Sequence, residues 1–259
     1  MIDAKDKAAL LDLAIAAALK AGPPIMAVYA EDFAVRRKED QSPVTQADEL
    51  AEATILEMLE REAPDIAAIA EERETADASG AAPARFWVID PLDGTKEFVA
   101  RNGEFTVNIG LIEGGAPVLG VIYAPSLDLL YAASGPGTAK RRKPDGTFEL
   151  IAARPVPKEG AVIVHSRSHI NSPRIAEFAA TLPGSTRIVS GSAIKFCKLA
   201  AGEADIYPRF GPTMEWDTGA GQAILEAAGG SIVNLDGARL AYGKPAFRNA
   251  GFIARGRTS

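Results

Sequence analysis

The stretch Trp87–Phe98, WVIDPLDGTKEF, constrains the fold more than any other because an apolar strand must end there at charged residues. Asp90 and Asp93 follow the apolar run closely, and two crowded carboxylates repel each other and are costly to desolvate. Pro91 fixes φ and bends the chain, so both carboxylates can converge with the Leu92 carbonyl exposed between them. We therefore expect a positive charge to lie between the two carboxylates.

Helix-like and strand-like segments alternate along the chain, which predicts an α/β or α+β protein of layered sheets and helices. The N-terminal helical segment, Lys7–Tyr29, carries Pro23 and Pro24, and proline inside a helix predicts a break or kink. Gly-rich turns join the apolar runs of 106–134 into a predicted antiparallel meander. The Ala/Gly-rich loop of 75–84 is nondescript, as expected of a mobile flap.

A chain of 259 residues lies near the length at which a single core splits into two. Proline and charge concentrate at 152–160, which is typical of a connection between lobes. We therefore predict an N-terminal α+β lobe, 1–152, and a C-terminal α/β lobe, 153–259.

The net charge of −6 provides no basic field, so neither nucleic acid nor an anionic membrane is expected as a partner. The basic run Lys140–Lys143 precedes Pro-Asp-Gly and is interpreted as a solvated hairpin loop. Cys197 stands alone, which fits a reducing compartment, and we interpret it as buried helix packing. No uninterrupted apolar stretch approaches the length of a bilayer span, so we expect a cytoplasmic protein without a transmembrane segment. The sequence leaves the oligomeric state open between a monomer and a homodimer. It also leaves open a peripheral attachment at the inner membrane.

Carboxylates stand at the ends of three apolar segments, where a rigid backbone meets open space. They are Glu71, Asp90 with Asp93, and Asp217. With the Leu92 carbonyl they form a set of hard oxygen ligands, which suits Mg²⁺ rather than zinc. The chain has two histidines and one cysteine, which argues against a zinc or copper site. The sequence therefore predicts a magnesium site.

Gly94 and Thr95 follow the second aspartate and begin a predicted helix, so their amides form a ready anion site. An isolated Asp-Gly-Thr is usually only a turn followed by an N-cap. Here Glu71, Asp90 and Asp217 place metal-binding chemistry beside it, so the turn is interpreted as a phosphate cradle. Metal ligands next to a phosphate cradle indicate chemistry at phosphorus.

These motifs resemble the signatures of the inositol monophosphatase superfamily. The three signatures are Glu71-Glu72, WVIDPLDGTKEF and WDTGAGQAILEAAGG. Finer features are similar to its CysQ branch, the 3'(2'),5'-bisphosphate nucleotidases: SPVTQAD, RNGEFTVNIGLIEGGAPVLGVIYAP, SRSH, GSAIKFC and YPRFGPTMEWD. The resemblance runs from about Ala21 to Phe252 and implies a layered αβαβα sandwich with the site between two lobes.

The resemblance implies two or three bound Mg²⁺ ions. The implied ligands are Glu71, Asp90, the Leu92 carbonyl, Asp93 and Asp217. It also implies that Glu71 with Thr95, and Asp48 near a further metal, position and deprotonate the attacking water. Two metal ions roughly 4 Å apart lower the pKa of bound water, so no covalent nucleophile is needed. The resemblance further implies sensitivity to lithium.

Inositol phosphates and nucleotide bisphosphates share the cleaved phosphate, so the C-terminal lobe must distinguish them. Ser192 and Lys195 lie one helical turn apart, where they would hold a second, uncleaved phosphate, and Arg209 adds a cation. Surface solvation is the alternative for both basic residues, and a plain loop histidine is the alternative for His169 of SRSH. The residues implied to contact substrate are Leu92, Asp93, Gly94, Thr95, His169, Ser192, Lys195, Arg209 and Asp217.

Other readings of the motifs are weaker. Ser192 and Lys195 also satisfy the S-x-x-K pattern of serine β-lactamases, but the S-D-N and K-T-G partners do not occur in the chain. A phospholigand-binding or metal-sensing protein, an inositol monophosphatase and a sugar-bisphosphate phosphatase remain as alternatives. We expect Mg²⁺-dependent hydrolysis of the 3'-phosphate of adenosine 3',5'-bisphosphate to AMP and phosphate. Its sulfated precursor is a second expected substrate, in sulfur assimilation.

Overall fold

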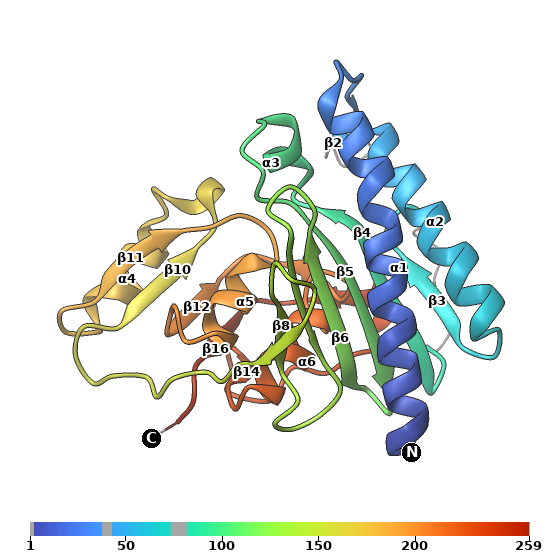
Figure 1. Cartoon of the computed structure of the whole chain (residues 1–259). Helices are drawn as coiled ribbons and strands as arrows, with labels where there is room; N and C mark the ends of the chain where they lie inside the picture. The colour runs from blue at the N-terminus through green and yellow to red at the C-terminus, as the bar shows by residue number, and fades with distance from the viewer. Residues whose placement is uncertain (1–2, 38–42, 74–81, 259) are drawn as a thin grey trace.

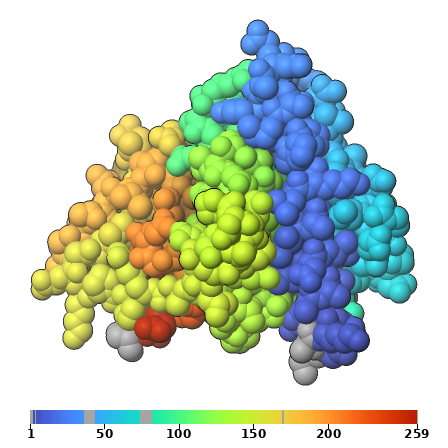
Figure 2. Space-filling view, in the orientation of Figure 1, coloured from blue at the N-terminus to red at the C-terminus, as the bar shows by residue number. Residues whose placement is uncertain are grey.

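The computed structural model describes residues 3–37, 43–73 and 82–258. Its elements stack as five layers, α, β, α, β and α, as the resemblance implied (Figure 1). Residues 75–81 of the expected flap lie outside the described residues. In the space-filling view the N-terminal helices form the right side, the middle strands the centre, and segments of the C-terminal half the left side (Figure 2).

The first layer consists of helices α1 (Ala4–Ala30) and α2 (Gln46–Glu62). Of the expected break or kink at Pro23 and Pro24, the break is wrong, because α1 runs through both prolines, and the kink stays a prediction. Buried residues on both sides, including Ala21 and Ile25, hold that part of α1 in the core, and this packing offsets the backbone hydrogen bonds lost at proline.

Helix α1 is long and apolar enough, by length and composition alone, to cross a membrane, although no uninterrupted apolar stretch of that length was expected. A core helix passes the same test. The buried face of α1, which includes Leu11, Ala14 and Ala18, packs in the same core as α2 and the large sheet. The absence of a transmembrane segment therefore stays a prediction.

The large sheet has the strand order β3-β4-β5-β6-β7-β8-β9. Its strands are β3 (Ala67–Ala70), β4 (Arg85–Asp93), β5 (Thr106–Glu113), β6 (Ala116–Ala124), β7 (Leu129–Ala133), β8 (Lys140–Arg142) and β9 (Phe148–Leu150). Strands β5, β6 and β7 pair antiparallel, which confirms the predicted meander. The interpretation of Lys140–Lys143 as a loop is wrong for its first three residues. They form β8, because pairing with β7 and β9 and ion pairs of Arg141 and Arg142 accommodate the basic side chains.

The second sheet has the strand order β11-β10-β12-β16-β14. Its strands are β10 (Val162–His165), β11 (Thr186–Val189), β12 (Ile206–Arg209), β14 (Ser231–Asn234) and β16 (Phe252–Arg255). Helices α5 (Ile194–Ala200) and α6 (Gly219–Ala227) lie between the sheets, and α4 (Pro173–Ala180) lies beside β10 and β11 (Figure 1). The remaining elements are α3 (Thr95–Val99), η1 (Arg167–His169), η2 (Pro245–Phe247), β1 (Arg36–Arg37), β2 (Pro43–Val44), β13 (Thr213–Met214) and β15 (Arg248–Asn249).

Helix α6 lies almost directly on the backbone of β5 and β6. A Cβ atom on Gly120 of β6 would approach the carbonyl oxygen of Ala220 to 2.5 Å and its Cα to 2.7 Å. A Cβ on Gly110 of β5 would approach the Ala220 nitrogen to 2.9 Å. Glycine at both positions lets the first turn of α6 contact the sheet, which fixes the chain just before it.

Candidate active site

A β-bulge at the end of β4 brings the two central aspartates to one edge of the large sheet. Asp90 is the partner of Asn108 and Asp93 is the partner of Thr106, so β4 carries one residue more than β5 over this interval. The Leu92 N–H donates to Asp90 Oδ1 at 3.0 Å, which fixes the carboxylate against the bulge.

Three carboxylates meet beside this bulge. Oxygen atoms of Glu71, Asp90 and Asp217 all lie within 4.8 Å of one another. Glu71 follows β3, which runs parallel to β4, so the ends of the two strands lie at the same sheet edge. Asp217 precedes α6, and its Oδ2 accepts the Met214 N–H at 2.7 Å.

Burial and mutual repulsion disfavour the charged forms of Asp90 and Asp217. Burial, followed by the charges of Glu71 and Asp93, raises the pKa of Asp90 well above its ordinary value. Burial, followed by the charges of Asp93 and Glu71, raises the pKa of Asp217 to about 7. A divalent cation among these oxygens would favour the charged carboxylates. Mg²⁺ prefers ligand sets that consist of oxygen atoms. The residues therefore fit a metal site.

Asp93 is not a member of this cluster of three. Its Oδ2 accepts the Ser192 hydroxyl at 2.7 Å and lies 3.4 Å from Asn108 Nδ2. Its ligand role stays a prediction, but its charge acts on both Asp90 and Asp217.

Asp48 and Thr95 lie near each other, and the charge of Asp48 acts on Asp90. Asp48 Oδ2 accepts the N–H and hydroxyl of Thr45, both at 2.8 Å, and this capping box begins α2. The Thr95 hydroxyl lies 3.4 Å from Asp48 Oδ1 and 3.4 Å from the Leu92 carbonyl. Burial raises the pKa of Asp48, the hydrogen bonds from Thr45 oppose this, and the charge of Glu71 adds to it.

The predicted helix after Asp93 exists as α3. Gly94 is its N-cap with φ of +90°, a conformation that favours glycine. A Cβ on Gly94 would lie 3.2 Å from Ser192 Cβ and 3.3 Å from the Glu104 carbonyl. The turn that begins α3 therefore lies directly against the segment that carries Ser192.

Lys195 is buried, so the alternative of surface solvation is wrong for it. Its side chain is 3% exposed, and its Nζ donates to the carbonyls of Ser192 and Ser190 and lies 5.2 Å from the centroid of the Tyr207 ring. Burial lowers the pKa of Lys195 to about 8, and the charge of Asp93 opposes that shift. A buried ammonium whose acceptors, in the part of the chain that the structure describes, are backbone carbonyls is suited to binding an anion.

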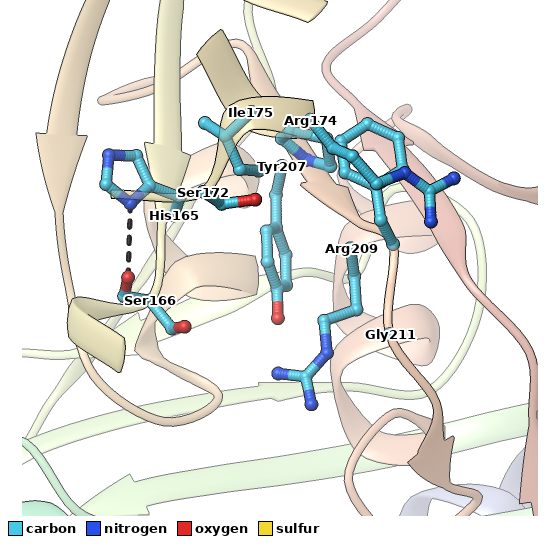
Figure 3. A pocket seen from close by; sticks show the side chains of 10 residues that line it. His165, Ser166, Ser172, Arg174, Ile175, Tyr207, Arg209 and Gly211 are labelled. Carbon is cyan, nitrogen blue, oxygen red and sulfur yellow. Dashed lines mark hydrogen bonds between the residues drawn. The ribbon is translucent and has the colours of Figure 1, made fainter. Parts of the chain in front are cut away.

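Arg209 lines a neighbouring cavity of about 210 Å³ at the ends of β10 and β12 (Figure 3). Its guanidinium extends to the same side of the cavity as the Tyr207 hydroxyl (Figure 3). Within the described residues, Nη2 donates to the Pro212 carbonyl at 3.1 Å, whereas the buried Nε has no hydrogen-bond partner. His169 lies in η1, and its side chain is outside what the structure describes. Among the described side chains His165 lines the cavity, and its Nδ1 lies 3.1 Å from the Ser166 carbonyl.

Sequence reasoning missed Glu52, a buried carboxylate on α2. It is 3% exposed, and its Oε2 accepts the Glu72 N–H at 2.8 Å, which holds the chain just after Glu71. The sequence held one signal for its burial. Glu52 lies four residues after Asp48, on a helix face that carries the core residues Ala51 and Ile55.

Comparison with known proteins agrees with this geometry. Residues 6–256 match the model of the inositol monophosphatase family. The chain belongs to the inositol monophosphatase family. It is 45% identical over 239 residues to the 3'(2'),5'-bisphosphate nucleotidase CysQ of Salmonella typhimurium, covering 91% of this chain and 95% of that relative. It is 40% identical over 247 residues to the CysQ of Escherichia coli K12, covering 94% and 98% of the two chains.

Solved structures of this family have the same fold. CysQ from Bacteroides thetaiotaomicron superposes with a TM-score of 0.83 at 36% identity, covering 97% of this chain and 98% of that one. An inositol monophosphatase from Anabaena superposes with a TM-score of 0.75 at 29% identity, covering 96% and 91%. Members of the family named for different substrates thus share this layered architecture.

Proposed function

We propose that this protein is a Mg²⁺-dependent 3'(2'),5'-bisphosphate nucleotidase that hydrolyses the 3'-phosphate of adenosine 3',5'-bisphosphate to AMP and phosphate. The observation that carries the proposal is a three-carboxylate cluster next to Asp93, whose carboxylate accepts the Ser192 hydroxyl in the loop to which the buried Lys195 donates. Asp93 links the two parts, because its charge acts on Asp217 on one side and on Lys195 on the other. Relatives at 40–45% identity carry the name of this activity.

Glu71, Asp90 and Asp217 would hold the metal, with the Leu92 carbonyl and Asp93 as the remaining ligands. Bound Mg²⁺, as two or three ions, would supply Lewis-acid stabilisation of the phosphoryl oxygens and lower the pKa of a bound water. Displacement of Mg²⁺ by lithium belongs to the same proposal.

Thr95 and Asp48 would accept and pass on the proton of the attacking water. The Thr95 hydroxyl points between Asp48 and the Leu92 carbonyl, so either oxygen can accept its proton. With Glu71 these side chains would orient the attacking water and take up its proton. The Gly94 and Thr95 amides would hold the departing phosphate.

The uncleaved phosphate would lie against Ser192, Lys195 and Arg209. A charged, buried lysine gains most from an anion because it has no carboxylate of its own in hydrogen-bonding distance among the described residues. Arg209 would use its unpartnered Nε, and His169 would contact the nucleoside. The sulfated precursor of adenosine 3',5'-bisphosphate would be a second substrate, and the enzyme would serve sulfur assimilation in the cytoplasm as a monomer or a homodimer.

The decisive experiment compares kcat/KM for adenosine 3',5'-bisphosphate and inositol 1-phosphate, with Mg²⁺ and with EDTA. We expect preference for the nucleotide and loss of turnover in EDTA. Lys195→Ala should lower kcat/KM for the nucleotide by at least about tenfold, since a charge-assisted contact contributes about 1.5–3 kcal/mol. Lys198→Ala, on the same helix but paired with Glu203 at 3.6 Å, is the matched control and should leave the preference unchanged. Preference for inositol 1-phosphate, or indifference to Lys195, would refute the proposal.

A further inference from the structure

Glu104 joins the segment after α3 to the C-terminal sheet. Its Oε2 accepts the Gly191 N–H at 3.0 Å and Arg167 Nη2 at 2.6 Å, and its Oε1 lies 3.5 Å from the Ser190 hydroxyl. The Glu104 side chain is 22% exposed, so its contacts with Gly191 and Ser190 are partly buried, whereas its ion pair with Arg167 is exposed. One side chain of the N-terminal half thus binds the loop between β11 and α5 and the start of η1.

That loop has an unusual backbone. Ser192 has φ of +53°, which is uncommon for a residue with a side chain. Gly191 fits only because it lacks a Cβ, which would lie 2.6 Å from the Glu104 carbonyl and 2.8 Å from its Cβ. The surrounding contacts must therefore hold the loop in place, and the carboxylate of Glu104 supplies the hydrogen bond at its centre.

The same loop sets the groups that would face the uncleaved phosphate. Ser192 donates its hydroxyl to Asp93 Oδ2 at 2.7 Å. Lys195 Nζ donates to the Ser190 and Ser192 carbonyls, on either side of the residue whose amide Glu104 holds. A shift of this loop therefore moves the ammonium and the hydroxyl together.

We propose that Glu104 is a positioning residue for substrate choice: it fixes the loop 190–192 so that Ser192 and Lys195 present one preformed site to the uncleaved phosphate. Glu104 itself does not touch the substrate. The inference rests on the proposed function for the identity of that phosphate, but the loop geometry is independent of it.

The test compares Glu104→Ala, Glu104→Gln and Glu113→Ala. Glu113 is the matched control because it is 17% exposed and pairs with Arg85 at 2.6 Å, far along β5 from the loop. Substrates are adenosine 3',5'-bisphosphate and adenosine 3'-monophosphate, which lacks the uncleaved phosphate. We expect Glu104→Ala to raise KM for the bisphosphate about tenfold, with kcat and the monophosphate KM changed less than twofold. Glu104→Gln keeps an oxygen acceptor for the Gly191 N–H and should recover most of the affinity.

Equal losses for both substrates, or a Glu113→Ala profile that matches Glu104→Ala, would show that Glu104 acts through stability alone. Crystal structures of wild type and Glu104→Ala provide a readout that needs no turnover. We expect the variant to lose the positive φ at Ser192 or its bond to Asp93, and an unchanged loop would overturn the inference. If wild type hydrolysed neither nucleotide, the proposed function would fail while the crystal structures still decided the role of Glu104.

Discussion

Replacing Asp90 with asparagine should stabilise the metal-free protein while abolishing its response to Mg²⁺. Asp90 is 1% exposed and shares its surroundings with the carboxylates of Glu71 and Asp217, so its charge is unfavourable without a cation. Asparagine has nearly the same shape, and its amide oxygen can still accept the Leu92 N–H. The substitution therefore removes charge with little change in packing.

The size of the effect follows from Coulomb's law. At a separation of 4.8 Å each pair of carboxylates in the cluster repels by about 3.5 kcal/mol at an effective dielectric constant of about 20. Protonation relieves part of this repulsion in the wild type. A net gain of about 2 kcal/mol in the metal-free free energy of unfolding is expected, which corresponds to about 4–8 °C in Tm for a chain of this size.

Thermal unfolding is measured in EDTA and across a Mg²⁺ titration. Wild type should gain about 2.7 kcal/mol at a Mg²⁺ concentration one hundred times its Kd, whereas Asp90→Asn should gain little and release no phosphate. A variant that is less stable than wild type in EDTA, or that Mg²⁺ stabilises equally, would refute the assignment of the cluster to metal binding.

Four further outcomes are expected. Lys195 has its pKa lowered to about 8, so its charge is lost as pH rises through that value; KM for the bisphosphate should rise above about pH 8, and Lys195→Arg should remove this dependence. The same shift means that, below about pH 8, the buried charge of Lys195 lowers the free energy of unfolding. This destabilisation should diminish as pH rises from about 8 toward 10.5, the ordinary pKa of lysine. Thr95→Ala should lower kcat by about 10²-fold or more with less change in KM, whereas Thr95→Ser should retain most activity. Gly120→Ala should destabilise the fold by about 3 kcal/mol in urea unfolding, whereas Gly211→Ala, whose added Cβ meets nothing within 4 Å, should change stability little.

Local signals in the sequence were sufficient for much of the fold and for the centre of the site. The apolar run before Asp90, the proline after it and the glycine before Thr95 specify a strand, a bend and a helix start without reference to distant residues. The strand, the bulge and α3 are all present. Glu71 was found by the same reasoning, because a carboxylate at the end of an apolar strand lies at a sheet edge.

Features that depend on tertiary packing could not be predicted from these local signals. The prolines of α1 predict a break by their own chemistry, and only the buried surroundings of that helix explain its continuity. From the sequence, Glu104 is predicted to be an ordinary charged loop residue, because its partner Gly191 is 87 positions away. The surroundings of Lys195 likewise include the ring of Tyr207, which lies on β12, a separate element that follows it in the chain.

The contact between α6 and the large sheet has a mechanical consequence. Asp217 precedes a helix whose first turn lies against the glycine backbone of β5 and β6, and those strands continue the sheet that carries Asp90. All three clustered carboxylates therefore belong to one tightly packed body, although Asp217 belongs to the C-terminal part of the sequence. Lys195 and Arg209 are held instead through the loop at Gly191 and the end of β12. A movement of the second sheet relative to the large sheet would therefore leave the three clustered carboxylates together.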